Sequence, residues 1–102
     1  MTDEDTAAEP SQAFTLYRNA PNPFNPSTTI RYSLRESSLA TLAVYNSLGQ
    51  KIRTLVDGSQ AAGVHTVQWD GCNESGQRVS SGVYFYRLQS GTYRKTMKMV
   101  LF

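Results

Sequence analysis

From Phe14 onward, apolar and polar residues alternate in short runs that are separated by polar or glycine-rich turns. An alternation with a period of two predicts β-strands that bury one face. The clearest run is residues 28–34, where Ile30, Tyr32 and Leu34 share one face and polar residues share the other. Further strands are predicted at residues 14–19, 40–46, 64–70, 83–90 and 93–102, with a short one at 78–81.

Residues 51–57 depart from this alternation, because Ile52 and Leu55 are three positions apart. The run is too short for a credible helix, so the spacing predicts a strand with a β-bulge or a switch between sheets. The segment that follows, Gly58 to Gly63, has a glycine at each end and is predicted to be a loop.

Seven or eight short strands with turns every 8–12 residues indicate an all-β protein. A sheet with one apolar face must bury that face against another layer, so an antiparallel β-sandwich of the immunoglobulin or fibronectin III type is expected. The composition agrees, because valine, threonine and aromatic residues are abundant and favour strands.

The chain divides into an acidic N-terminal segment and one small domain. Residues 1–12 contain four acids and Pro10 without strand or helix periodicity, which indicates a linker or an expression remnant. Residues 13–102 then form the domain, which carries ten Lys and Arg against four acids. An acidic tail on a basic body hints at charged partners, although a solvated linker is the simpler interpretation.

Several classes are excluded by what the sequence lacks. No apolar run approaches the ~18 residues of a membrane helix. The N-terminus has no signal-peptide pattern, so any export signal would lie elsewhere. Cys72 is the only cysteine, which excludes an internal disulfide and a CxxC zinc site.

Candidate chemistry is sparse, and no catalytic residues, cofactor or metal site are assigned. His65 shares a strand face with Val67 and Trp69, so packing at the rim of the core is expected rather than catalysis. Cys72 lies in a polar turn and is expected to be an exposed, unreactive thiol. Asp70, with Asn73 and Glu74, offers oxygen ligands for calcium as an alternative, but Asp70 is expected to bind backbone amides of its own turn.

A small basic group near the C-terminus consists of Arg94, Lys95 and Lys98, with Tyr93 beside it. Nucleic-acid binding would require a larger basic footprint, so no nucleic-acid partner is expected. Lysines that prevent edge-to-edge aggregation of strands are the simpler interpretation. Exposed tyrosines leave sugar binding open as a further hypothesis.

Residues 20–26 contain three prolines in six residues, which forbid a helix and predict a rigid extended corner with Phe24 plugging the edge of the core. Four stretches in the same order and spacing resemble the type A C-terminal sorting domain of proteins exported by the type IX secretion system: APNPFNPSTTIRYSL, AVYNSLGQKIRTLVDGSQAAGVHTVQWDG, SGQRVSSGVYFYRL and KMVL. The central part is also similar to the Ig-like domain of the flagellar hook-capping protein. Its shared residues include Trp69, Asp70, Gly71, Gly82, Tyr84 and Tyr86, to which we assign structural roles together with Phe24.

The resemblance implies a non-catalytic sorting domain that directs a larger upstream cargo, in the same polypeptide, through the periplasm to the cell surface or the medium. Its partners would be the outer-membrane secretion machinery and a sortase-like component, and the domain itself is expected to be a monomer. The family's signal in the final strand maps onto Lys98, Met99, Val100 and Leu101. Many members end in a basic residue after this strand, whereas this chain has Phe102. The alternative is a structural or adhesive Ig-like module, with carbohydrate binding as one form of it, that spaces or anchors a neighbouring domain.

Overall fold

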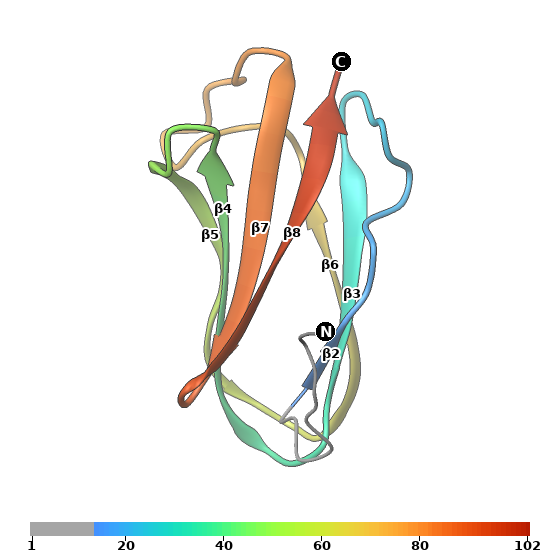
Figure 1. The fold of residues 1–102 in the computed structure, drawn as a ribbon, viewed down its shortest axis with the longest axis vertical. Coiled ribbons are helices and arrows are strands. Elements are labelled where there is room, and N and C mark those ends of the chain that lie inside the picture. The colour runs from blue at the N-terminus through green and yellow to red at the C-terminus, as the bar shows by residue number, and fades with distance from the viewer. Residues whose placement is uncertain (1–13) are drawn as a thin grey trace, which may run out of the picture.

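The computed structural model describes residues 14–102, which form two facing antiparallel sheets without a helix (Figure 1). The smaller sheet has the order β2-β3-β6, from β2 (Phe14–Leu16), β3 (Thr28–Leu34) and β6 (Gly63–Trp69). The larger sheet has the order β5-β4-β7-β8, from β4 (Ser38–Asn46), β5 (Lys51–Gln60), β7 (Gly82–Ser90) and β8 (Tyr93–Leu101). The predicted Ig-like sandwich is therefore confirmed, with seven strands in the described part of the chain. The predicted linker at residues 1–12 lies outside the described residues.

The core lies between the sheets and is built from the apolar face of each alternating strand. Ile30 and Tyr32 of β3 face Leu42 of β4 and Leu88 of β7 across this layer, and each is at most 1% exposed. The alternation in β7 places Tyr84 and Tyr86 inside and leaves Val83 on the outer face, as expected for a strand in the middle of a sheet.

The irregular spacing in β5 arises from two β-bulges, so the bulge interpretation is confirmed. In the pairing of β4 with β5, the register shifts once beside Leu55 and again beside Ile52. Each extra residue turns the following side chains over, and this allows both Ile52 and Leu55 to pack against the core although they are three positions apart.

Two local predictions were wrong. The loop predicted at 58–63 is mostly strand, because β4 begins at Ser38 and supplies partners for β5 as far as Gln60. The short strand predicted at 78–81 is absent, since this segment makes only one isolated bridge, between Arg78 and Cys72. Its carbonyl at Ser80 instead accepts a hydrogen bond from the Tyr84 hydroxyl, 2.6 Å away.

Gly82 opens β7 with a φ of 150°, a conformation that L side chains rarely adopt, so another residue there would be strained. In the described residues, no helix is long and apolar enough to cross a membrane.

Candidate recognition site at the end of the last strand

The proline-rich segment Ala20–Pro26, called the corner below, lies along the outer edge of the last residues of β8. The Phe24 N–H donates to the Val100 carbonyl at 3.0 Å, and the Phe102 N–H donates to the Phe24 carbonyl at 3.1 Å. The Val100 N–H donates to Oδ1 of Asn22, also at 3.0 Å. The corner therefore replaces a neighbouring strand at the end of β8, although about 75 residues separate the two in sequence.

Side chains on the approach to the corner fix its position. Oγ1 of Thr28 donates to the Pro21 carbonyl at 2.9 Å, and Nδ2 of Asn19 donates to Oγ1 of Thr28 at 3.0 Å. The Tyr86 hydroxyl donates to the Tyr17 carbonyl at 2.7 Å and accepts from the Asn19 N–H at 2.9 Å. Burial raises the pKa of Tyr86 above its ordinary value, so the hydroxyl that donates here stays protonated to a higher pH than that of an exposed tyrosine. The corner is thus fastened to both sheets.

The inner side of the corner supplies one of three aromatic rings that pack in a row. Phe24 is only 1% exposed, and its ring centroid lies 5.7 Å from that of Trp69. The ring of Trp69 in turn meets the ring of Tyr84 edge-on at 5.4 Å. Gly71 lies under the corner with a φ of 78°, and a Cβ there would be 2.9 Å from the Pro26 carbonyl oxygen. The backbones of Gly71 and Pro26 are therefore so close that any residue other than glycine would force them apart.

The four residues to which the sorting signal was assigned occupy different environments. Lys98 is exposed on the outer face of the sheet. Met99 and Leu101 are buried in the core, at 0% and 5% exposure. Val100 is half-buried, and both of its main-chain groups bind the corner. The accessible surface here is therefore formed jointly by Lys98, the outer side of Val100 and the corner.

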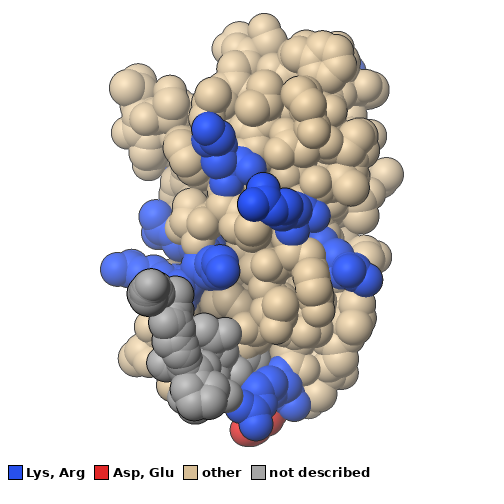
Figure 2. All heavy atoms as spheres, turned by 45° about the vertical axis from the view of Figure 1, so that its right-hand side comes forward, with Lys and Arg blue, Asp and Glu red and all other residues tan. Residues whose placement is uncertain are grey.

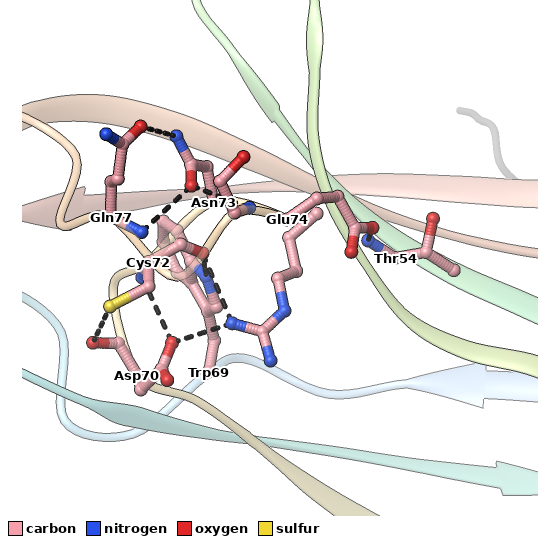
Figure 3. Close-up of polar contacts among 9 residues, drawn as sticks. Thr54, Trp69, Asp70, Cys72, Asn73, Glu74 and Gln77 are labelled. Atoms are coloured by element: carbon pink, nitrogen blue, oxygen red, sulfur yellow. Dashed lines mark hydrogen bonds and ion pairs between the residues drawn. The ribbon is translucent and has the colours of Figure 1, made fainter.

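The loop from Asp70 to Gln77 covers the opposite edge of the same sheet (Figure 3). Oε2 of Glu74 accepts from the Thr54 N–H at 2.7 Å, and the Glu74 N–H donates to the Ile52 carbonyl at 3.2 Å. Oδ1 of Asp70 accepts from the Cys72 N–H at 3.0 Å, as expected for an aspartate that stabilises its own turn. Both edges of the larger sheet are thus covered at the end of the sandwich where Trp69 of β6 lies.

The oxygen atoms considered for calcium are directed at protein partners. Oδ1 of Asp70 also accepts from Nη1 of Arg53 at 3.0 Å, and Oδ1 of Asn73 accepts from the backbone N–H groups of Ser75 and Gln77. In the described residues, no group of three or more His, Cys, Asp or Glu side chains is arranged to hold a metal ion.

A repeated turn that the sequence analysis did not recognise shapes the same end of the sandwich. Asn46–Gln50 and Asn73–Gln77 both follow the pattern N-x-x-G-Q, and their hydrogen bonds correspond one for one. In each turn the asparagine Oδ1 accepts two backbone N–H groups, and the glycine adopts a φ close to 80°. The repeated five-residue pattern in the sequence could have revealed the two equivalent turns. Their hydrogen bonds indicate a structural role.

His65 and Cys72 both make contacts that stabilise the fold. The His65 ring stacks on Tyr32 with centroids 5.2 Å apart, and Nε2 lies 2.7 Å from the Ala61 carbonyl oxygen. His65 is half-buried, which confirms the expected position at the rim of the core. Cys72 is partly buried rather than exposed, because its turn folds against Trp69, whose indole N–H donates to the Cys72 carbonyl at 2.9 Å.

Comparison with known proteins places this sandwich in a family. Residues 25–94 match the family model described as the FlgD Ig-like domain, and the chain belongs to that family. The FlgD structure from P. aeruginosa is 28% identical, with a TM-score of 0.57, over 72% of this chain and 58% of that one. No sequence among the curated proteins matches the chain significantly.

Two structures from Porphyromonas gingivalis show the same fold at lower identity. Dimeric latent PorU aligns with a TM-score of 0.69 at 18% identity, over 86% of this chain and 9% of that one. PorZ, described as an essential surface component of the type IX secretion system, aligns with a TM-score of 0.62 at 19% identity, over 85% of this chain and 11% of that one. The chain therefore spans about a tenth of the length of either protein.

Proposed function

We propose that this chain is a non-catalytic sorting domain that directs a larger cargo protein through the type IX secretion system. The cargo would precede the domain in the same polypeptide and reach the cell surface or the medium by way of the periplasm. The partners would be the outer-membrane secretion machinery and a sortase-like component that receives the cargo. The domain would act as a monomer.

The observation that carries this proposal is the contact between the corner and the end of β8. The resemblance to the sorting family includes these two segments, whereas the resemblance to the hook-capping domain concerns the central part of the chain. The four residues that bond the two segments lie outside residues 25–94, the part that matches the FlgD Ig-like model: Asn22, Phe24, Val100 and Phe102. The hydrogen bonds between them join two distant motifs into one surface that a receptor can recognise only on the folded domain.

The likeness to PorZ supports the proposal in a second way. It shows that a domain of this fold occurs within a surface component of a type IX secretion system. The sorting role of this chain is inferred from the joined motifs and not from that likeness, which concerns the fold alone.

A structural or adhesive Ig-like module is the second candidate, and the match to FlgD favours it. FlgD from Xanthomonas campestris is described in terms of hook capping and flagellar assembly, and it aligns over 87% of this chain with a TM-score of 0.58 at 18% identity. On this alternative the sandwich would space or anchor a neighbouring domain. Tyr93, which is 42% exposed, would be a candidate for contact with a carbohydrate.

Fusion of the full chain to the C-terminus of a periplasmic reporter separates the two candidates. In a bacterium with a type IX secretion system, the sorting role predicts that the reporter becomes accessible to surface labelling. In the same host without the translocation channel, the reporter should stay in the periplasm. Retention in the periplasm of both hosts would contradict the sorting role and favour the structural module.

A matched pair of variants tests whether the end of β8 is read. Lys98→Ala should reduce the surface fraction of the reporter, because Lys98 is the exposed charge nearest to the corner on this strand. Lys51→Ala removes an exposed lysine from β5, the opposite edge strand of the sheet, and should leave export unchanged. Equal export by both variants would exclude Lys98 from the signal.

A further inference from the structure

Among residues 14–102, nothing pairs with the outer main-chain edge of residues 94–98, the lower part of β8 in Figure 1, and this stretch is called the open edge below. In an antiparallel pair, the N–H and C=O groups of every second residue point away from the partner strand. Both main-chain groups of Val100 point away from β7, because they bind the corner. The same orientation recurs at every second residue before Val100, namely at Lys98, Thr96 and Arg94. Their main-chain groups therefore point to the side where the described residues supply no neighbouring strand.

The corner marks the upper limit of this open edge. It binds Val100 and Phe102, so an added strand would have to end below Val100. The opposite edge of the sheet is covered at Ile52 and Thr54 by Glu74. An unpaired edge of this kind is a template for another extended chain, and strand addition is a common mode of peptide recognition.

The charge around the open edge is positive. Arg94, Lys95 and Lys98 are all exposed, and the sequences of β2, β7 and β8 contain no acid. Figure 2 shows Lys and Arg side chains spread over the side of the molecule where β8 and β3 lie, with acidic atoms only at the lower rim.

The four acids of the described residues lie elsewhere. Asp57 is on β5, at the opposite edge of the sheet, and Asp70 and Glu74 belong to the loop that covers β5. Glu36 is in the turn between β3 and β4. The field at the open edge therefore favours an anionic partner.

We propose that the open edge of residues 94–98 binds an extended acidic segment of a partner protein by strand addition. This inference rests on the proposed function, because the partner protein is taken to be a component of the secretion machinery. Main-chain hydrogen bonds to Arg94, Thr96 and Lys98 would hold the segment, and the basic side chains would select acidic residues in it. The same side chains oppose pairing with a second copy, because that pairing would bring like charges together.

The test is binding of a fluorescent octapeptide that alternates valine with glutamate, measured by anisotropy with the full chain at low salt. The matching peptide with lysine in place of glutamate should bind at least about tenfold more weakly. The glutamate peptide with N-methyl groups on alternate amides should also lose about tenfold, because it keeps its charge but loses main-chain donors. Equal binding of the methylated and unmethylated peptides would show attraction by charge alone and overturn strand addition.

Variants of the chain locate the binding site. Thr96→Pro removes an N–H that points to the open side and leaves the main-chain hydrogen bonds between β7 and β8 in place. It also removes the exposed contact of Thr96 Oγ1 with Nε of Arg87 at 3.4 Å, so the fold should persist while affinity falls about tenfold. Arg94→Glu with Lys98→Glu should lose at least as much affinity, whereas Lys51→Glu on β5 should change it less than about twofold. Circular dichroism checks that each variant is folded, and a folded Thr96→Pro variant with unchanged affinity would overturn the proposal.

Two other occupants of the edge would give different results. If a second copy fills the edge, sedimentation will show a dimer that Thr96→Pro dissociates. If the acidic segment of residues 1–12 fills it, replacing Asp3, Glu4, Asp5 and Glu9 by their amides will raise peptide affinity about tenfold. Either result would overturn the proposed partner.

The reporter fusion keeps this inference separate from the proposed function. Export of the fusion without any peptide binding would reject the acidic strand and leave the sorting role intact. Peptide binding by a domain that fails to export its reporter would reject the sorting role alone.

Discussion

Replacing Trp69 by alanine is expected to lower the free energy of unfolding by about 3–5 kcal/mol, as for other large aromatic residues in cores. The side chain is 0% exposed, and its ring lies between those of Phe24 and Tyr84. Truncation leaves a cavity and also removes the indole donor from the Cys72 carbonyl. A domain of this size has only about 5–15 kcal/mol in total, so the variant is expected to be near its stability limit.

Urea denaturation followed by circular dichroism measures this loss. Val64→Ala is the matched control on the same strand, because Val64 is 64% exposed and its truncation should cost less than about 0.5 kcal/mol. A Trp69→Ala variant as stable as the Val64→Ala control would show that the rings at this end of the sandwich are not packed as described.

Replacing Phe24 by alanine is expected to cost about 3–5 kcal/mol as well, although Phe24 belongs to a loop. Its side chain is 1% exposed and packs on Trp69, while its main chain bonds to Val100 and Phe102. The loss should therefore affect the corner and the end of β8 together. Thermal and urea unfolding measure the loss in stability.

Phe102→Ala is the control for this prediction. The Phe102 N–H donates to the Phe24 carbonyl, but the Phe102 side chain is 66% exposed. Its truncation should cost less than about 0.5 kcal/mol. If both variants lost the same stability, Phe24 would not be the residue that attaches the corner to the core.

The positions of the strands and the two-layer fold could be predicted from the sequence because each strand follows a local rule. The alternation of Ile30, Tyr32 and Leu34 decides which face of β3 is buried, and one sheet with such a face requires a second. The bulges of β5 also left a trace in the sequence, since a regular strand would place Ile52 and Leu55 on opposite faces. Strand ends were less predictable, because the extent of β5 depends on the length of β4, its partner.

The contact between the corner and β8 could not be predicted in the same way. No periodicity links Asn22 to Val100, and a proline-rich segment has no ladder pattern that reveals its partner. The resemblance to the sorting family pointed to both motifs but gave no reason for them to meet. The long-range hydrogen bonds of the structure supply that reason, because the corner takes the place of a strand only where β8 ends.

In the proposed function, recognition of this domain depends on an outer edge of β8 that the corner covers at its end and that is open at residues 94–98. Hydrogen exchange of individual amides in the full chain, followed by NMR, distinguishes the covered part of this edge from the open part. The Val100 N–H, bonded to Asn22, should exchange at least about tenfold more slowly than the N–H groups of Thr96 and Lys98. Equal exchange rates at Val100 and Lys98 would contradict the account.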